Sequence, residues 1–523
     1  MLRLTPEIME HYANRMRNST NPIEARSLLM GINPGSEHPV ILDSDLLMEH
    51  MHILGPTGSN KTSKGLIPLI TNLIRNGETC IILDLKGDDA LFHTTKLETE
   101  RAGRKFKWFT NRTRHSTYVF NPFLQKHLDS MSVADVTGFI ISALNMHHGD
   151  DYGRAYFTVM GRTLLQDALN RSVGVASVGA NASIERKRRS INSFEDLFAA
   201  VDELAHTEEF RNARHLSYVI RNLAGIPQLN LASRETEEEE AVLKNQIHLP
   251  EVIAKKQVAY FYLTPAADPT SASEIARLAV YSTVNAAADH YASTGKRPRV
   301  LIICDEAQHL IAKNISTVLE QSRSLGVGMV LCHQTLSQLN PPGGVDLREL
   351  VLNCTVTKQF WAARDPATRD YISKISGEVR YYNASWQQLP ERVQREEVGR
   401  CYAARSHMEE DYLIRIQEET GPRLTAQDID NLGRDPNMCI MAIQRNHGYS
   451  CYDGAFPVAS PWPMSKTEFD RRRHLPWPAK TKETMVVMPN WFSHANDQPD
   501  ELDELDEAAK AGLFDELDAI ETL

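Results

Sequence analysis

The sequence has no apolar stretch long enough to cross a membrane. A spanning helix needs about 20 consecutive apolar residues, and no run in these 523 residues approaches that length. The first residues, Met-Leu-Arg-Leu-Thr-Pro, also lack the apolar core of a secretory signal. The sequence therefore predicts a soluble protein whose membrane contact is peripheral or made through partners.

Cysteine is scarce, with seven residues and no Cys-x-x-Cys pair. This spacing gives neither a zinc site nor a disulfide framework. Cys80, Cys304 and Cys332 lie within apolar, strand-like runs, where a cysteine is most often a small buried side chain. We therefore expect a reducing, cytoplasmic location and no structural zinc.

The chain also lacks the net positive charge that is common in nucleic-acid-binding proteins. Its net charge is −11, but residues 497–523 hold eleven acidic residues and one lysine, which leaves the rest of the chain near −1. Total charge therefore neither favours nor excludes a nucleic-acid partner. The acidic tail is expected to be disordered, or to form a short helix on a partner.

Continuous apolar runs alternate with helical patterns, which indicates an α/β fold. Four of these runs are typical of parallel strands buried on both faces, at 79–84, 258–263, 299–306 and 328–334. Three more strands are expected, an edge strand at 106–109, one at 356–361 and one at 439–444 that closes the sheet. Between 124 and 254 the helical patterns dominate, with charged loops such as 235–240, which predicts an inserted all-α domain.

A short apolar run that begins at His52 leads into a segment with the layout of a phosphate-binding P-loop. It reads Gly55-Pro56-Thr57-Gly58-Ser59-Asn60-Lys61-Thr62-Ser63 and leads into a helical pattern. In such a loop the backbone N–H groups and the helix N-terminus hold phosphate. These nine residues are the predicted ATP-binding set, in which Lys61 would reach the β- and γ-phosphates and the Thr62 hydroxyl would ligate Mg²⁺. Asn60 replaces the last glycine of the pattern, and asparagine tolerates a left-handed backbone better than other non-glycine residues.

A second motif supplies carboxylates. Four apolar residues lead into Asp305 and Glu306, where Asp305 would hold the Mg²⁺ shell and Glu306 would orient or deprotonate the attacking water. Gln334 ends the next strand and could sense the γ-phosphate, or could be a strand-end amide that bonds a loop. Arg323, on a helix predicted at 315–325, could reach the γ-phosphate of a neighbouring subunit, or could be a solvated helix arginine.

These motifs divide the chain into six predicted segments. They are an N-terminal helical segment at 1–37, the two parts of a nucleotide-binding domain at 38–123 and 255–460, the all-α insertion at 124–254, an extended wrap at 461–496 and the acidic tail at 497–523. The expected fold is an α/β, RecA-like P-loop domain with a mainly parallel central sheet and an inserted all-α domain.

Taken together, the motifs resemble the coupling proteins of type IV secretion and conjugation systems, within the FtsK–HerA class of DNA translocases, over most of residues 38–458. The P-loop matches apart from Asn60, Cys304-Asp305-Glu306 matches the Walker B motif, and Arg323 stands where the family's arginine finger stands. Other similar segments are Asp84-Leu85-Lys86-Gly87-Asp88, Tyr118 to Phe123, His333 to Leu339, Arg364-Asp365-Pro366 and Tyr371 to Lys374. Typical members carry N-terminal transmembrane helices, so the chain resembles the soluble members or the soluble part of a split system.

The resemblance implies a homo-oligomeric ring, commonly a hexamer, with ATP and Mg²⁺ between subunits and DNA in a central channel. Single-stranded DNA is the preferred cargo, with duplex DNA or protein left open, and the all-α domain and acidic tail would bind relaxosome or secretion-system proteins. Basic residues that could hold DNA, or could form solvated surfaces, are Lys86, Arg112, Arg114 and the cluster from Arg186 to Arg189. Two other functions stay open, a HerA-like helicase–translocase in DNA repair or phage defence, and a non-hydrolysing, nucleotide-gated adaptor.

Overall fold

The structure is a computed structural model, and it describes residues 5–112, 118–147, 152–172, 191–232, 237–264, 269–310, 315–340, 345–388, 412–444, 454–460 and 464–478. The chain divides into two compact units. The α/β unit comprises Met1–Lys107 and Leu249–Pro476, and the helical unit comprises Trp108–His248 and Trp477–Leu523. The acidic tail, Arg114 and the cluster from Arg186 to Arg189 lie outside the described residues. The division into six segments stays a prediction.

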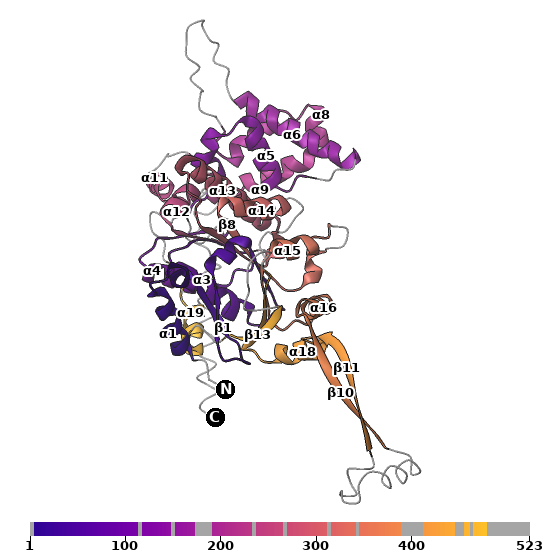
Figure 1. Cartoon of the computed structure of the whole chain (residues 1–523). Coiled ribbons are helices and arrows are strands. Elements are labelled where there is room, and N and C mark those ends of the chain that lie inside the picture. Colours follow the sequence, from indigo (N-terminus) through magenta and orange to yellow (C-terminus); the bar gives the residue numbers. More distant parts are fainter. Residues whose placement is uncertain are drawn as a thin grey trace, which may run out of the picture. The chain divides into compact units, whose positions relative to one another are not determined.

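The core of the α/β unit is one large sheet (Figure 1). Its eleven strands are β1 (Leu28–Ile32), β2 (Pro39–Leu42), β3 (Met51–Leu54), β4 (Thr79–Asp84), β5 (Phe106–Thr110), β6 (Val258–Tyr262), β7 (Val300–Asp305), β8 (Val327–His333), β9 (Thr357–Phe360), β12 (Met438–Ile443) and β13 (Ala455–Ala459). Their order is β2-β1-β13-β12-β9-β3-β8-β7-β4-β6-β5. From β9 through β6 the neighbours run parallel.

The parallel strands are buried at every position, which explains the continuous apolar runs of β3, β4, β6, β7 and β8. β9 is also buried throughout, but three of its residues, Thr357, Lys358 and Gln359, are polar. This confirms the α/β class and the mainly parallel sheet. β5 is the last strand of the sheet, as expected for an edge strand. The expectation that residues 439–444 close the sheet is wrong, because β12 pairs with β9 on one side and continues through β13, β1 and β2 on the other.

Helices connect the strands of the α/β unit. They are α1 (Pro6–Arg17), α2 (Pro22–Arg26), α3 (Ile67–Arg75), α4 (Asp89–Arg101), α12 (Leu249–Ala254), α13 (Pro269–Thr294), α14 (Ile315–Gln321), α15 (Arg348–Cys354), α16 (Pro366–Ile375), α18 (Ala426–Arg434) and α19 (Lys466–Arg473). Helix α19 lies where an extended segment was expected, and the Ser465 side chain caps its N-terminus. A separate two-stranded ribbon, β10 (Glu378–Gln388) and β11 (Tyr412–Pro422), was not foreseen (Figure 1).

The described part of the helical unit, apart from the end of β5, consists of helices and loops. Its helices are α5 (Val133–Ala143), α6 (Tyr152–Ser172), α7 (Phe194–Asp202), α8 (Glu208–Asn212), α9 (Arg214–Ala224), α10 (Pro227–Asn230) and α11 (Glu237–Lys244). Apolar side chains such as Leu197, Val201 and Ile220 are fully buried between them. Residues 237–240 belong to α11 rather than to a charged loop. Within the described ranges of the whole chain, no helix is long and apolar enough to cross a membrane.

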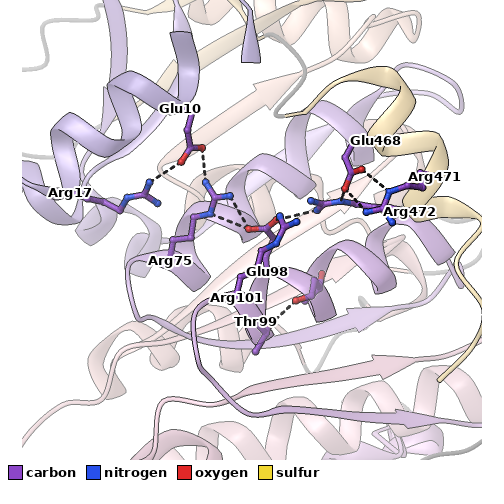
Figure 2. Close-up of polar contacts among 10 residues, drawn as sticks. Glu10, Arg17, Arg75, Glu98, Thr99, Arg101, Glu468, Arg471 and Arg472 are labelled. Atoms are coloured by element: carbon purple, nitrogen blue, oxygen red, sulfur yellow. Dashed lines mark hydrogen bonds and ion pairs between the residues drawn. The ribbon is translucent and has the colours of Figure 1, made fainter. Parts of the chain in front are cut away.

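A buried carboxylate, Glu98 of α4, ties the ends of the α/β unit together (Figure 2). Its side chain is 3% exposed and pairs with Arg75 of α3 at 2.8 Å, Arg101 at 2.9 Å and Arg472 of α19 at 3.1 Å. Arg75 also bonds Glu10 of α1 at 2.7 Å. Burial alone would raise the pKa of Glu98, but Arg75 and then Arg472 hold the pKa below its ordinary value. Glu98 therefore stays ionised and holds α3, α4 and α19 in one network.

Replacing Glu98 by Gln should lower the free energy of unfolding by about 3 kcal/mol, because it leaves the buried Arg472 and the partly buried Arg75 without the carboxylate that joins them. The pKa of Glu98 is lowered in the folded state, so its contribution is complete above the unfolded pKa of about 4.3 and is lost as the pH falls through the folded value. Urea unfolding at neutral and acidic pH measures both effects.

The matched control is Glu100→Gln on the same helix, where the carboxylate is 50% exposed and pairs with Lys96. It should change stability by less than about 1 kcal/mol. A Glu98 variant as stable as this control would show that the network does not fasten the unit.

Candidate active site

The P-loop connects the end of β3 to the helix that leads into α3. A Cβ on Gly55 would lie 2.5 Å from Ser59 Oγ and 2.8 Å from Trp361 Cβ, so only glycine fits there. Gly58 has a φ of +80°. The helix opens with one wide π-helical segment, Lys61–Leu66, before α3 begins. The loop therefore has the tight, irregular backbone that phosphate binding requires.

Asn60 adopts the left-handed conformation, with φ 68° and ψ 14°. Its side-chain Nδ2 lies 3.5 Å from the carbonyl oxygen of Pro436, and Lys64 Nζ donates to that carbonyl at 2.8 Å and to Asn437 Oδ1 at 2.6 Å. The segment between α18 and β12 thus contacts the start of the P-loop helix. Asparagine fulfils here the conformational role of the glycine that it replaces.

Three of the four predicted catalytic side chains, those of Lys61, Glu306 and Gln334, meet at the C-terminal ends of the parallel strands. Lys61 Nζ donates to Glu306 Oε1 at 2.9 Å, and Gln334 Nε2 donates to Glu306 Oε2 at 3.2 Å. Thr62 Oγ1 donates to Asp305 Oδ2 at 3.3 Å. Five residues that the sequence singled out therefore form two adjacent sets of contacts, although they come from three separate segments of the chain.

Strand register explains this convergence. β3, β8 and β7 are parallel neighbours, with Leu54 opposite His333 and Asp305 opposite Cys332. Each strand therefore ends at the same level, and the polar residue that follows each apolar run emerges beside the next. Glu306 has a φ of +56°, which marks the turn where the chain leaves β7.

The electrostatics of the site favour the ionised forms of Lys61 and Glu306. Burial alone would raise the pKa of Glu306, but Lys61 and the amides of Gln308 and Gln334 lower it below its ordinary value. Burial alone would lower the pKa of Lys61, yet Cys332 and then the carboxylates of Asp305 and Glu306 raise it. Burial raises the pKa of Asp305, which Lys61 only partly offsets. A carboxylate oxygen of Asp305 beside the Thr62 hydroxyl is an oxygen pair that suits Mg²⁺.

Arg323 does not join this cluster. It lies in a 3-10 turn, Ser322–Leu325, immediately before β8 begins, whereas Lys61 and Glu306 follow the ends of β3 and β7. Because these strands are parallel, Arg323 lies at their N-terminal ends, opposite to the C-terminal ends where Lys61 and Glu306 lie. Its side chain is 56% exposed and pairs with Glu49 at 2.8 Å.

Sequence reasoning missed three features around the site. Gln308 donates to Glu306 Oε2 at 2.8 Å, and no pattern distinguishes it from any polar residue two positions after a strand. Pro436 and Asn437 lie far from the P-loop helix in the sequence, and only the tertiary fold brings them into contact with it. Asp84 was noted as part of a family-like segment without a site role, and its position opposite Asp305 in adjacent strands follows from register alone.

Replacing Asn60 tests the backbone of the P-loop. Asn60→Gly should keep ATP affinity within a few-fold of wild type, whereas Asn60→Val should weaken it by about tenfold, since the left-handed conformation costs a residue with an ordinary Cβ about 1–2 kcal/mol. Titration with a fluorescent ATP derivative measures this. Asn431→Val, on the exposed surface of α18, is the control, and equal affinity of both valine variants would contradict the requirement.

Comparison with known proteins agrees with this geometry. The sequence matches the family model described as type IV secretory system conjugative DNA transfer over residues 34–420. The fold is similar to that of unbound bacterial conjugative coupling protein TrwBdeltaN70, with TM-score 0.53 and 13% identity over 86% of this chain and 91% of that chain. No curated protein matches the chain.

Two nucleotide complexes of plasmid coupling protein TrwB have the same likeness. The complex with the ADPNP analogue gives TM-score 0.54 and 13% identity over 87% of this chain and 92% of that chain. The complex with ADP and Mg²⁺ gives TM-score 0.50 and 13% identity over 87% and 91%. At this identity the structures show a shared fold, and the family match spans most of the sequence, with the P-loop and both acidic residues inside it. The chain therefore belongs to the type IV secretory system conjugative DNA-transfer family.

Proposed function

We propose that the chain is an ATP-driven motor that moves DNA, or a DNA–protein complex, in conjugation or type IV secretion. The observation that carries this proposal is the joined cluster of Lys61, Glu306 and Gln334, with Thr62 and Asp305 beside it, in a member of a DNA-transfer family. Its structural relative TrwB was solved with ADPNP and with ADP and Mg²⁺, which supports ATP and Mg²⁺ as the ligands of this site.

Each side chain has a role that its contacts support. Lys61 would turn from Glu306 toward the β- and γ-phosphates, and this would free Glu306 to hold the attacking water. Thr62 and Asp305 would hold Mg²⁺, which when bound neutralises charge on the phosphates. Gln334 already bonds Glu306, so its amide would report whether the terminal phosphate is present.

Arg323 supports a shared site between subunits. It cannot serve its own Glu306, because it lies at the other edge of the sheet, and its guanidinium is half exposed. In a ring, Arg323 would reach the γ-phosphate of the nucleotide bound to the neighbouring subunit, where an arginine stabilises the charge of the transition state. We propose a hexameric ring with single-stranded DNA in its channel, and contacts to relaxosome or secretion-system proteins through the helical unit and acidic tail.

A non-hydrolysing adaptor would be favoured by a P-loop that Asn60 distorts, and the left-handed backbone of Asn60 argues against such a distortion. The HerA-like alternative shares the same catalytic cluster, but the family match is to conjugative DNA transfer. We therefore favour the conjugative motor over both.

ATP hydrolysis should require Lys61 and Arg323 from different subunits. Lys61→Ala and Arg323→Ala should each lower DNA-stimulated kcat by about 10³-fold or more, because an arginine finger is worth that much. A mixture of the two variants should recover part of the activity, since mixed rings contain intact shared sites. Steady-state hydrolysis with and without single-stranded and duplex DNA measures this.

Arg348→Ala is the control, because this exposed arginine pairs with Asp346 away from the site. It should leave kcat unchanged. Wild-type protein that binds ATP but shows no turnover with any DNA would sink the motor proposal. Loss in both variants without recovery on mixing would reject the shared site alone.

A further inference from the structure

The loop after β4 is built around a second buried carboxylate. Asp84 Oδ1 accepts the backbone N–H groups of Lys86 at 3.1 Å and Gly87 at 2.8 Å, and Oδ2 accepts that of Asp88 at 2.8 Å and the Tyr260 hydroxyl at 2.8 Å. These four hydrogen bonds occupy the whole carboxylate. They fix the course of residues 85–88 directly above the strand end.

A second tyrosine secures the same loop. Tyr262 donates from its hydroxyl to the carbonyl oxygen of Gly87 at 3.0 Å and to Asp89 Oδ1 at 2.7 Å. Gly87 has a φ of +76° and a Cβ there would lie 3.3 Å from the Tyr262 ring, so the turn requires glycine. The loop thus has one conformation, held from β4 and from β6.

This arrangement is expensive for the fold. Asp84 is opposite Asp305 in the adjacent strand, and both carboxylates are buried. Burial and then the charge of Asp305 raise the pKa of Asp84 to about 7. Like charges placed together in a buried site are typical of functional positions, where geometry matters more than stability.

Lys86 is the basic residue of this loop. Its side chain is 45% exposed and pairs with Asp88 at 3.3 Å. Partial burial alone would lower the pKa of Lys86, but Asp88, Asp305 and Glu306 together raise it. Lys86 follows β4, which pairs in parallel with β7, and Asp84 two residues before it lies opposite Asp305, the last residue of β7. Lys86 therefore lies next to the strand end that carries Asp305 and Glu306. Lys61 reaches the same pair from the β3 side.

We propose that Lys86 is a second cation of the nucleotide site, which contacts the terminal phosphate of a bound nucleoside triphosphate, and that Asp84 positions it. This inference rests on the proposed function, since it assumes that a nucleotide occupies the P-loop. It gives Lys86 a role in place of the DNA contact that the sequence suggested, because Lys86 follows the strand that pairs with β7, with Asp84 opposite Asp305. A cation there would stabilise charge on the phosphate during transfer.

The test compares Lys86→Ala, Lys86→Arg, Asp84→Asn and the control Lys96→Ala in the full chain. Lys96 lies on α4 and pairs with Glu100, away from the site. Three quantities are measured: kcat and KM for ATP, the separate affinities for ATP and ADP, and the affinity for a single-stranded oligonucleotide at several salt concentrations. Circular dichroism checks that each variant is folded.

Lys86→Ala should lower kcat by about 10²-fold and should weaken binding of ATP but not of ADP, which lacks the terminal phosphate. DNA affinity and its salt dependence should not change. Lys86→Arg should keep most of the activity, Lys96→Ala should behave as wild type, and Asp84→Asn should shift the ATP-to-ADP affinity ratio in the same direction as Lys86→Ala.

The inference is overturned if Lys86→Ala weakens DNA binding, reduces the salt slope by about 1 and leaves the ATP-to-ADP affinity ratio unchanged. Lys86 would then be a DNA contact. An unchanged ratio with unchanged DNA binding would also overturn it. If the wild type binds nucleotide without hydrolysing it, the motor proposal fails, but the affinity ratio still decides whether Lys86 meets the terminal phosphate.

Discussion

The strands in the middle of the large sheet are buried on both faces, so their polar side chains become accessible to a ligand only where a strand ends. Parallel register brings those ends to one level. Residues that follow three apolar runs, far apart in the chain, therefore meet in one place. The chemistry of the candidate active site depends on this constraint, because the phosphate-binding loop and the carboxylates that would hold water and Mg²⁺ come from different segments of the chain.

Concentrating charge at one edge has an electrostatic cost that the site offsets with pairs. Lys61 satisfies Glu306, and the Thr62 hydroxyl contacts Asp305. Buried ion pairs contribute little net stability, but they are sensitive to the arrival of another charged group. A triphosphate brings strong negative charge to this edge, so the existing pairs are those that would rearrange. In the ring that we propose, the exposed Arg323 at the other end of the strands would complete the site of a neighbouring subunit, which would link hydrolysis to assembly.

Fastening the helices around the sheet relies on a different kind of buried charge. Glu98 on α4 binds arginines from α3 and α19, and Arg75 of α3 also binds Glu10 of α1 (Figure 2). Because α3 continues the P-loop helix, this network connects the start and the end of the α/β unit to the element that carries Lys61. One carboxylate that faces three guanidinium groups thus links helices from both ends of this unit.

Local patterns in the sequence were sufficient to predict the α/β class, the P-loop, and the acidic residues after β7. Each depends on an apolar run and the polar residue directly after it, and these lie next to each other in the chain. The tertiary structure alone decided that β13, β1 and β2 extend the sheet beyond β12, that Glu98 collects arginines from α3 and α19, and that Asp84 stands opposite Asp305. These features depend on which distant segments become neighbours, and strand order and register, rather than any local pattern of residues, determine that.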